Sequence, residues 1–162
     1  MKKTLLALLL TNSIYASGLF SVGHKNFGFT VGQDSAYGNE YTVMGVNFSY
    51  FVVDNISTGL TYYTWLGSEP SINQFTIPVT YHLPLKLPFR PYLGGFYSRT
   101  SVGENSAGFD YDDYNSYGAR VGATMQTSPN SYVSFGWVQE VTESGDDSST
   151  RGYPEISGGI SF

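Results

Sequence analysis

The sequence predicts an all-β fold, an eight-stranded antiparallel up-and-down transmembrane β-barrel that follows an N-terminal signal peptide. Three observations predict it. The chain starts with an export-signal pattern, continues in roughly eight segments of alternating apolar and polar residues, and ends on an aromatic strand residue, Phe162. A closed barrel pairs its last strand with its first, because hydrocarbon offers no water to an unpaired strand edge.

Residues 1–16 have the pattern of a secretory signal. Lys2 and Lys3 form a basic start, residues 4–10 form a short apolar run, and Ile14-Tyr15-Ala16 is a candidate cleavage motif. The apolar run is roughly half the ~20 residues that a membrane-spanning helix needs. We therefore expect cleavage after Ala16, a barrel domain over residues 17–162, and a location in the bacterial outer membrane.

The composition is unusual for a soluble domain. Charged residues make up 13% of the chain and aromatic residues 17%, whereas a typical soluble domain has about 25% charged residues. A soluble surface needs more charge than this to stay dispersed, but a surface that faces lipid does not. The net charge of −5 argues against a nucleic-acid partner, which needs a basic face. Because the chain has no cysteine, closure of the strand ladder must supply the stability.

The alternating segments define the expected strands. Runs of ~9–11 residues with apolar side chains outward and polar side chains inward are typical of tilted membrane strands. The segments are residues 27–32, 41–50, 56–65, 74–83, 91–100, 116–126, 132–142 and 153–162. In the clearest of them, Phe75, Ile77 and Val79 alternate with polar residues and should face lipid.

Two segments depart from the ideal pattern. Pro78 cannot donate a ladder hydrogen bond, so we expect a bulge or locally broken pairing beside it. Residues 91–100 carry aromatic side chains on both faces of the expected strand, which leaves open whether Arg99 points into the lumen.

The connectors between the strands predict the orientation of the barrel. Residues 51–55, with Asp54 and Asn55 as the periplasmic turn, and residues 127–131 are short, whereas residues 66–73, 101–115 and 143–152 are longer and polar. Short turns on the periplasmic side and longer loops outside are usual for outer-membrane barrels. Aromatic residues near the strand ends predict interfacial girdles, although aromatic residues also simply favour strands. The expected girdle residues are Tyr41, Tyr50, Trp65, Tyr81, Tyr92, Tyr132, Tyr153 and Phe162.

Three segments carry a resemblance to a known family. Residues 50–55 (YFVVDN) followed by Gly59-Leu60 resemble the strand–turn–strand signature of small outer-membrane β-barrel proteins, residues 90–95 (RPYLGG) are similar to the opening of the family's fifth strand, and Phe162 resembles its assembly signal. The resemblance implies an OmpX/OmpA-like barrel, surrounded by outer-membrane lipid and lipopolysaccharide. It also implies periplasmic chaperones and the barrel-assembly machinery as partners during biogenesis. The family shares no catalytic residues that could be carried over.

Inward-facing charges form the main candidate site. Pairing across residues 127–131 places Gly118 opposite Glu140 and Arg120 on the diagonal, and across the last loop Glu140 falls near Glu155. A buried charge without a partner is costly, so we expect Arg120 to bridge Glu140 and Glu155. This network could act as a gate or proton relay. The favoured interpretation is a structural plug, because an eight-stranded barrel is only wide enough to be filled by side chains.

Other candidate sites are weaker. The acidic residues 110–113 and 146–147 could bind a divalent cation, but they lack the spacing of an EF-hand loop, and solvated loops are favoured. His24 and His82 are the only histidines, so a zinc site is not expected. No Ser/His/Asp arrangement surrounds His82, which argues against an enzyme. We therefore expect no catalytic residue, cofactor or metal.

The function expected from these features is structural or surface-interactive. Extracellular loops on a rigid scaffold would serve adhesion or envelope maintenance around a filled lumen, in a monomer. Tyrosines among acidic and small residues suit contact with an extracellular protein, and equally suit loop packing. One alternative is a narrow channel for small solutes across the outer membrane. A third hypothesis, a soluble secreted carrier, requires an apolar interior and a polar exterior.

Overall fold

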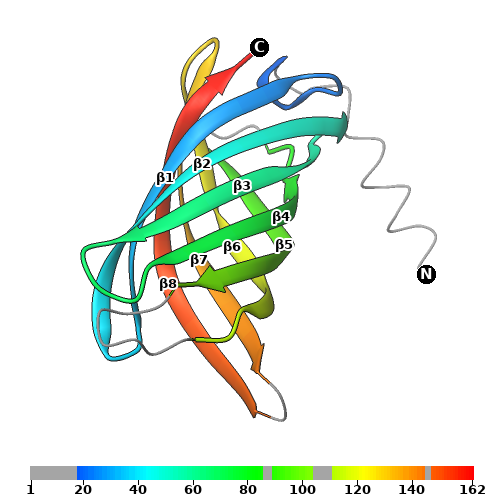
Figure 1. Ribbon diagram of the computed structural model, residues 1–162. Helices are drawn as coiled ribbons and strands as arrows, with labels where there is room; N and C mark the ends of the chain where they lie inside the picture. Colours follow the sequence, from blue (N-terminus) through cyan, green and yellow to red (C-terminus); the bar gives the residue numbers. More distant parts are fainter. Residues whose placement is uncertain (1–17, 86–88, 104–110, 145–146) are drawn as a thin grey trace, which may run out of the picture.

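The eight strands of the chain close into one antiparallel barrel in which every strand pairs with its neighbours in sequence (Figure 1). The computed structural model describes residues 18–85, 89–103, 111–144 and 147–162. A short 3₁₀ turn, η2 (Gly18–Phe20), precedes the strands. These are β1 (Lys25–Ala36), β2 (Asn39–Val53), β3 (Ile56–Leu66), β4 (Ile72–His82), β5 (Phe89–Val102), β6 (Tyr114–Ser128), β7 (Ser131–Ser144) and β8 (Asp147–Ser161). Within the described ranges, no helix has the length and apolar character needed to cross a membrane. The expected signal peptide lies outside them.

The last strand closes the barrel against the first, as the sequence predicts. β8 pairs antiparallel with β1 from Asn26 opposite Ser161 to Gly32 opposite Glu155. At the chain end, Phe162 and Lys25 exchange two backbone hydrogen bonds of 2.9 Å each. The terminal aromatic residue is therefore held by the ladder.

Apolar side chains point away from the barrel axis and polar side chains point into it. On β4, Phe75, Ile77 and Val79 are each more than half exposed, whereas Gln74 and Thr76 are buried. The other strands repeat this alternation, so an apolar belt surrounds a polar lumen. The soluble-carrier hypothesis is wrong, because it requires the opposite arrangement. An exposed belt of this extent is stable only against an apolar solvent.

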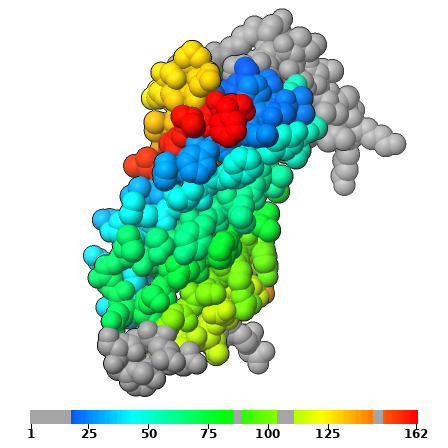
Figure 2. All heavy atoms as spheres, turned by 45° about the horizontal axis from the view of Figure 1, so that its top comes forward, coloured from blue at the N-terminus to red at the C-terminus, as the bar shows by residue number. Residues whose placement is uncertain are grey.

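The two ends of the barrel differ in their connections. At the turn end, Asp54-Asn55 joins β2 to β3, Pro129-Asn130 joins β6 to β7, and the chain terminates at Phe162. Figure 2 shows the C-terminal residues (red), the first described residues (blue) and the β6–β7 turn (yellow) gathered there. The opposite end, the loop end, carries the β1–β2, β3–β4, β5–β6 and β7–β8 connections. Asn55 has φ 66°, a conformation that Asn tolerates better than most residues.

Both departures from ideal strands are visible. The β3–β4 register is kept throughout, but the pairing is interrupted between Thr58 opposite Val79 and Thr61 opposite Thr76, which is the level of Pro78. The local break expected beside Pro78 is therefore confirmed. In β5, Ser98 and its same-face neighbours are buried while Arg99 is exposed, so Arg99 points outward.

Several aromatic residues expected in interfacial girdles lie inside the barrel. Tyr41, Trp65, Tyr92 and Tyr132 are all at most 9% exposed, and the Tyr153 hydroxyl reaches Glu140 in the lumen. The girdle prediction is therefore wrong for these five residues. Strand parity explains the result, because each of them occupies the same face of its strand as the polar lumen residues. Exposed aromatic residues on the outer face include Tyr50 and Phe162.

Candidate functional site: the lumen network

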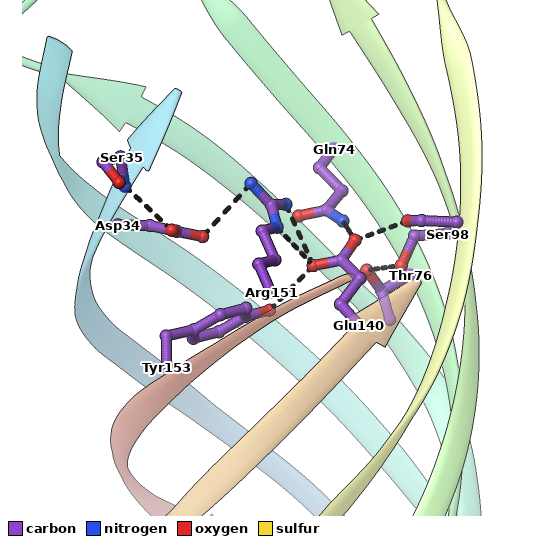
Figure 3. A network of polar contacts seen from close by, with 9 residues as sticks. Asp34, Ser35, Gln74, Thr76, Ser98, Glu140, Arg151 and Tyr153 are labelled. Atoms are coloured by element: carbon purple, nitrogen blue, oxygen red, sulfur yellow. Dashed lines mark hydrogen bonds and ion pairs between the residues drawn. The ribbon is translucent and has the colours of Figure 1, made fainter. Parts of the chain in front are cut away.

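A fully buried carboxylate occupies the loop-end half of the lumen. Glu140, on β7, has no exposed surface. Its Oε2 accepts hydrogen bonds from Arg151 Nε (3.1 Å) and Nη2 (2.9 Å) and from the Tyr153 hydroxyl (3.3 Å). Its Oε1 accepts from Gln74 Nε2 at 3.0 Å (Figure 3). The same oxygen also accepts from the Ser116 hydroxyl. Donors from β4, β6 and β8 thus surround the charge, which satisfies the condition for keeping a carboxylate buried.

Arg151 connects Glu140 on β7 to β1, across the place where β8 closes the barrel against β1. It lies directly across from Glu140 in the β7–β8 ladder, and its Nη1 is 3.2 Å from Asp34 Oδ2 on β1. Its guanidinium also stacks over the Trp65 ring, 4.8 Å from the ring centroid. The backbone ladder between β1 and β8 ends on the turn side of Arg151. Its last pair is Gly32 opposite Glu155, and the adjoining residue of β8, Pro154, lacks an N–H. On the loop side of that last backbone pair, β1 and β8 are therefore joined by side-chain contacts.

A second ion pair lies deeper in the lumen. Arg120 Nη2 on β6 is 2.6 Å from the carboxylate of Glu155 on β8, and both side chains are largely buried. Within the described residues, the lumen thus holds two separate charge clusters, one around Glu140 and one formed by Arg120 and Glu155.

The expected pairing of Arg120 with both carboxylates is corrected by this geometry. Gly118 does lie opposite Glu140, as predicted, but Glu155 lies opposite Gly136 rather than beside Glu140. The register places Arg151 next to Glu140 and leaves Arg120 to Glu155. Arg151 was missed because residues 143–152 were expected to be a loop. Arg151 is spaced by two and four residues from Tyr153 and Glu155, so all three share the lumen face of the strand. This spacing is the signal that could have identified it.

Aromatic residues fill the lumen at the loop end. Tyr41, Tyr63 and Trp65 form a buried cluster with Ile72 and Val102. The Tyr41 and Trp65 rings meet edge-to-face with their centroids 5.5 Å apart, a favoured geometry for aromatic pairs. This cluster adjoins the guanidinium of Arg151, so side chains occupy the lumen at this level. An open recess of about 470 Å³ lies beside it, and its lining includes Asp34, Tyr41 and Tyr153.

The turn end is closed by the segment that precedes β1. Phe20 is 3% exposed and lies edge-to-face against Phe51, with ring centroids 5.9 Å apart. Arg90 stacks over the Phe20 ring at 4.4 Å, and its Nη1 donates a 3.0 Å hydrogen bond to Asn55 Oδ1.

The two turn residues singled out from the sequence hold this segment in place. The Asp54 carboxylate accepts a 2.8 Å hydrogen bond from the backbone N–H of Val22. The backbone N–H of Asn55 donates to the carbonyl of Phe20, also at 2.8 Å. Asp54 and Asn55 therefore form the expected tight turn, and they also anchor the N-terminal segment.

The weaker candidates gain no partners that would suggest chemistry. Asp110 and Asp146 lie outside the described residues, whereas Asp113 pairs with Arg99 at 3.2 Å on the exterior. Hydrogen bonds from the Val102 backbone N–H, and then from Arg99 and Ser101, hold the pKa of Asp113 below its usual value. Across the described parts of the chain, no three His, Cys, Asp or Glu residues are grouped to hold a metal ion.

His82 lies in an aromatic environment. Its ring is 4.8 Å from Phe20, 5.7 Å from Phe51 and 5.8 Å from Tyr92, measured between centroids. Among the described residues, the ring of His82 thus packs against aromatic rings rather than against a nucleophile and a carboxylate.

Comparisons with known proteins agree on the fold. No protein-family model matches the sequence, and no curated protein matches it. The N-terminal β-barrel domain of Pseudomonas aeruginosa OprF superposes with a TM-score of 0.63 at 15% identity, covering 87% of this chain and 98% of that domain. Neisserial surface protein A superposes with a TM-score of 0.62 at 16% identity, covering 85% and 94%.

A third solved structure extends the agreement. The attachment invasion locus protein of Yersinia pestis, Ail, gives a TM-score of 0.52 at 11% identity, covering 87% of this chain and 99% of that protein. Identities this low carry the fold alone. The protein therefore has the closed eight-stranded barrel fold of small bacterial outer-membrane proteins, the fold of OmpX- and OmpA-like barrels.

Proposed function

We propose that the protein is a monomeric, integral outer-membrane barrel with a structural or surface-interaction role, in which a filled lumen braces a scaffold that presents extracellular loops. The filled lumen is the observation that carries this proposal. Glu140 and Arg151 close the loop-end half together with aromatic side chains, and Phe20 closes the turn end. A plugged cylinder is suited to holding loops in place.

The proposed orientation follows from the connections. The loop end would face the exterior and the turn end the periplasm, because outer-membrane barrels place short turns inside and longer loops outside. Residues 1–16 would be the signal peptide that delivers the chain to the periplasm. Phe162 would act as the assembly signal for the barrel-assembly machinery, after periplasmic chaperones have carried the chain.

An aromatic pair at the loop end, of which one ring is exposed and the other partly buried, supports a contact role there. Tyr37 is 44% exposed, and its ring lies 4.6 Å from that of Tyr111. An amphipathic ring held in place by a neighbour loses little conformational entropy on binding, which favours contacts with proteins. Another protein of this fold is an attachment invasion protein, which is compatible with adhesion as the surface role.

Cysteine labelling tests location and orientation together. The chain has no cysteine, so Ser35→Cys at the loop end and Thr127→Cys at the turn end each give one thiol. Both residues are exposed. A membrane-impermeant maleimide should label Ser35→Cys in intact cells, and Thr127→Cys only after permeabilisation. Labelling of Thr127→Cys alone in intact cells would contradict the orientation.

Conductance distinguishes the scaffold from the channel alternative. The purified protein should give no stable current steps in planar lipid bilayers. The channel alternative predicts that Arg120→Ala combined with Glu140→Gln opens a conducting path. A reproducible increase in conductance for this variant, with the barrel still folded, would contradict an inert lumen.

A further inference from the structure

The ladder that closes the barrel ends well before the loop end. β1 and β8 pair only as far as Gly32 opposite Glu155, although β1 continues to Ala36 and β8 begins at Asp147. The ladders on their other sides run the full distance, to Ala36 for β1 with β2 and to Asp147 for β7 with β8. Figure 1 shows the result, because the β1–β2 and β7–β8 hairpins spread apart at the loop end. Each of the two strands therefore has one unpaired edge there.

The hydrogen bonds at the chain end determine which backbone groups face this gap. Phe162 exchanges both of its backbone hydrogen bonds with Lys25 on β1, whereas the Ser161 N–H donates to the carbonyl of Asn130, which precedes β7. Along a strand with two antiparallel neighbours, successive residues direct their backbone groups to one neighbour and then to the other. The registers of β8 with both neighbours contain no shift. Even-numbered residues of β8 therefore direct their N–H and C=O groups towards β1.

Three residues of β8 are left with open backbone groups by this alternation. They are Ser148, Thr150 and Gly152, and all three are exposed. Within the described residues, no strand other than β7 pairs with this stretch. Pro154, the next residue of the same set, has no N–H to offer to β1, which explains why the pairing stops beside it.

The open edge of β8 lacks the usual protection against strand addition. Sheet edges are commonly protected by lysine, proline or a bulge, and Ser148, Thr150 and Gly152 provide none of these. The opposite edge of β1 is different. By the same alternation the Ser35 N–H faces the gap, but it already donates to Asp34 Oδ1 at 2.8 Å. The edge of β8 is therefore the one that is free to pair.

The surroundings of this edge carry an excess of negative charge. The open recess of about 470 Å³ lies at its turn-side limit, where the lining includes Gly152, Asp34 and Glu40. Asp34 and Glu140 share the single guanidinium of Arg151, which leaves one carboxylate charge unbalanced. Glu40 is exposed and adds another. A complementary partner would therefore be cationic.

The edge lies beyond the apolar belt of the barrel. Trp137, opposite Pro154, is the exposed apolar residue of β7 nearest to it, and Gln139 and Glu143 are exposed on the same face closer to the loop end. Polar outer residues at this level indicate contact with water rather than with lipid. A partner in solution can therefore reach the open backbone groups.

We propose that the unpaired edge of β8 over residues 148–152 is a docking site for an extended segment of an extracellular protein that is rich in lysine or arginine, which adds to the barrel as an extra strand. Backbone hydrogen bonds would supply the affinity, and the acidic recess the preference for basic side chains. This inference rests on the proposed surface role, because the loop end must face the exterior for such a partner to reach it.

A synthetic peptide tests strand addition. The probe is acetyl-Lys-Thr-Lys-Val-Lys-Thr-Lys-amide, titrated calorimetrically into the purified barrel in phosphatidylcholine nanodiscs. We expect saturable binding, with shifts of the amide resonances of Ser148, Thr150 and Gly152. The same peptide N-methylated at alternate residues, in one of the two phases, should lose this binding because its backbone can no longer donate to the edge. A version with glutamate in place of lysine should bind more weakly.

Protein variants separate the backbone from the charge. Thr150→Pro removes one N–H that faces the gap, and sheet edges tolerate proline. It should weaken binding by about tenfold, the effect of one hydrogen bond, whereas Thr150→Ala keeps the N–H and should bind normally. Glu40→Gln should weaken binding by about threefold, as for an exposed ion pair. Asp112→Asn removes an equal charge from an exposed residue outside the recess and is the matched control.

Each contrary outcome has a definite meaning once unheated gel migration has established that the variants are folded. Absence of saturable binding, or equal binding to the Thr150→Pro and Thr150→Ala variants, would overturn strand addition. Equal binding of the glutamate peptide would overturn the basic preference. Disulfide-linked dimers of Thr150→Cys, formed without peptide, would assign the edge to a second copy of the chain instead.

The titration also separates this inference from the proposed function. Both ends of the barrel are open to solution in a nanodisc, so the peptide result does not depend on orientation in the cell. Failure to bind, together with labelling of Ser35→Cys in intact cells, would overturn the docking site and leave the surface role standing. Labelling of the turn end alone would overturn both.

Discussion

Arg151→Met isolates the contribution of the guanidinium that partners Glu140. The change removes two hydrogen bonds to Glu140, at 2.9 and 3.1 Å, and the 3.2 Å ion pair with Asp34. Methionine retains much of the side-chain volume, so the main loss is the positive charge and its donors. Glu140 would remain fully buried.

The expected magnitude follows from what is left around the carboxylate. Removing one partner of a buried ion pair costs about 3–5 kcal/mol. Gln74, Ser116 and Tyr153 still donate to Glu140, so we expect the lower limit, about 3 kcal/mol, which is roughly a 10²-fold change in the unfolding equilibrium. Adding Glu140→Gln removes the uncompensated charge and should restore about 1–2 kcal/mol of the loss.

Urea unfolding in lipid vesicles measures this effect, with the migration of unheated samples on gels as the readout. Tryptophan fluorescence is less suitable, because Arg151 stacks on Trp65 and the substitution alters that emission directly. Arg99→Met is the matched control. Its pair with Asp113 has side chains 54% and 39% exposed, so the change should cost no more than about 1 kcal/mol. Equal losses for the two arginines would refute the assignment of Arg151 to a buried, stabilising network.

Three further predictions concern the loops, the strand packing and the chain end. The pKa of Asp113 is lower in the folded than in the unfolded protein, so its stabilising contacts are complete above about pH 4 and are lost as the pH falls through the folded pKa. The Val102 amide resonance should shift in that acidic range. A transition near neutral pH would contradict this prediction. Gly45→Ala places a methyl group 2.5 Å from a buried tyrosine ring and should cost about 1–3 kcal/mol. Gly32→Ala, with its nearest contact at 3.5 Å, should change the urea midpoint little; equal effects would argue against tight packing in the lumen. Deleting Phe162 removes two ladder hydrogen bonds and should lower the yield of heat-modifiable barrel, whereas an unchanged yield would remove its proposed assembly role.

The architecture could be predicted from the sequence because membrane barrels impose one simple pattern. Phe75, Ile77 and Val79 must meet lipid while Gln74 and Thr76 face the lumen, and this alternation is visible without any tertiary information. The consequence of Pro78 was also predictable, since a missing N–H must interrupt pairing on one side.

The candidate site was predicted only in part, because contacts across the lumen depend on register. Glu140, Glu155 and Arg120 were identified as inward charges. The contact between Arg120 and Glu155 was predicted as well. Arg151 was not predicted as the partner of Glu140, because the last strand was expected to begin at residue 153 rather than at Asp147. The structure extends β7 and β8 almost to the tip, which brings Arg151 opposite Glu140.

The position of Phe20 at the turn end was not predicted, for a different reason. Residues 18–24 have no alternation, and no local rule places Phe20 in the mouth of a barrel. Its burial arises from contacts with Phe51, His82 and Arg90, which come from strands far along the chain. Such contacts cannot be inferred from a single sequence pattern.

Site-directed spin labels along β4 test the central claim most directly, that the apolar outer face of the barrel contacts lipid while the polar face lines a packed lumen. Cysteines at positions 74–79 would each carry one label in lipid vesicles. Labels at positions 75, 77 and 79 should be readily accessible to oxygen dissolved in the bilayer, whereas those at 74 and 76 should be shielded. A uniform profile, or one with the opposite parity, would contradict the account.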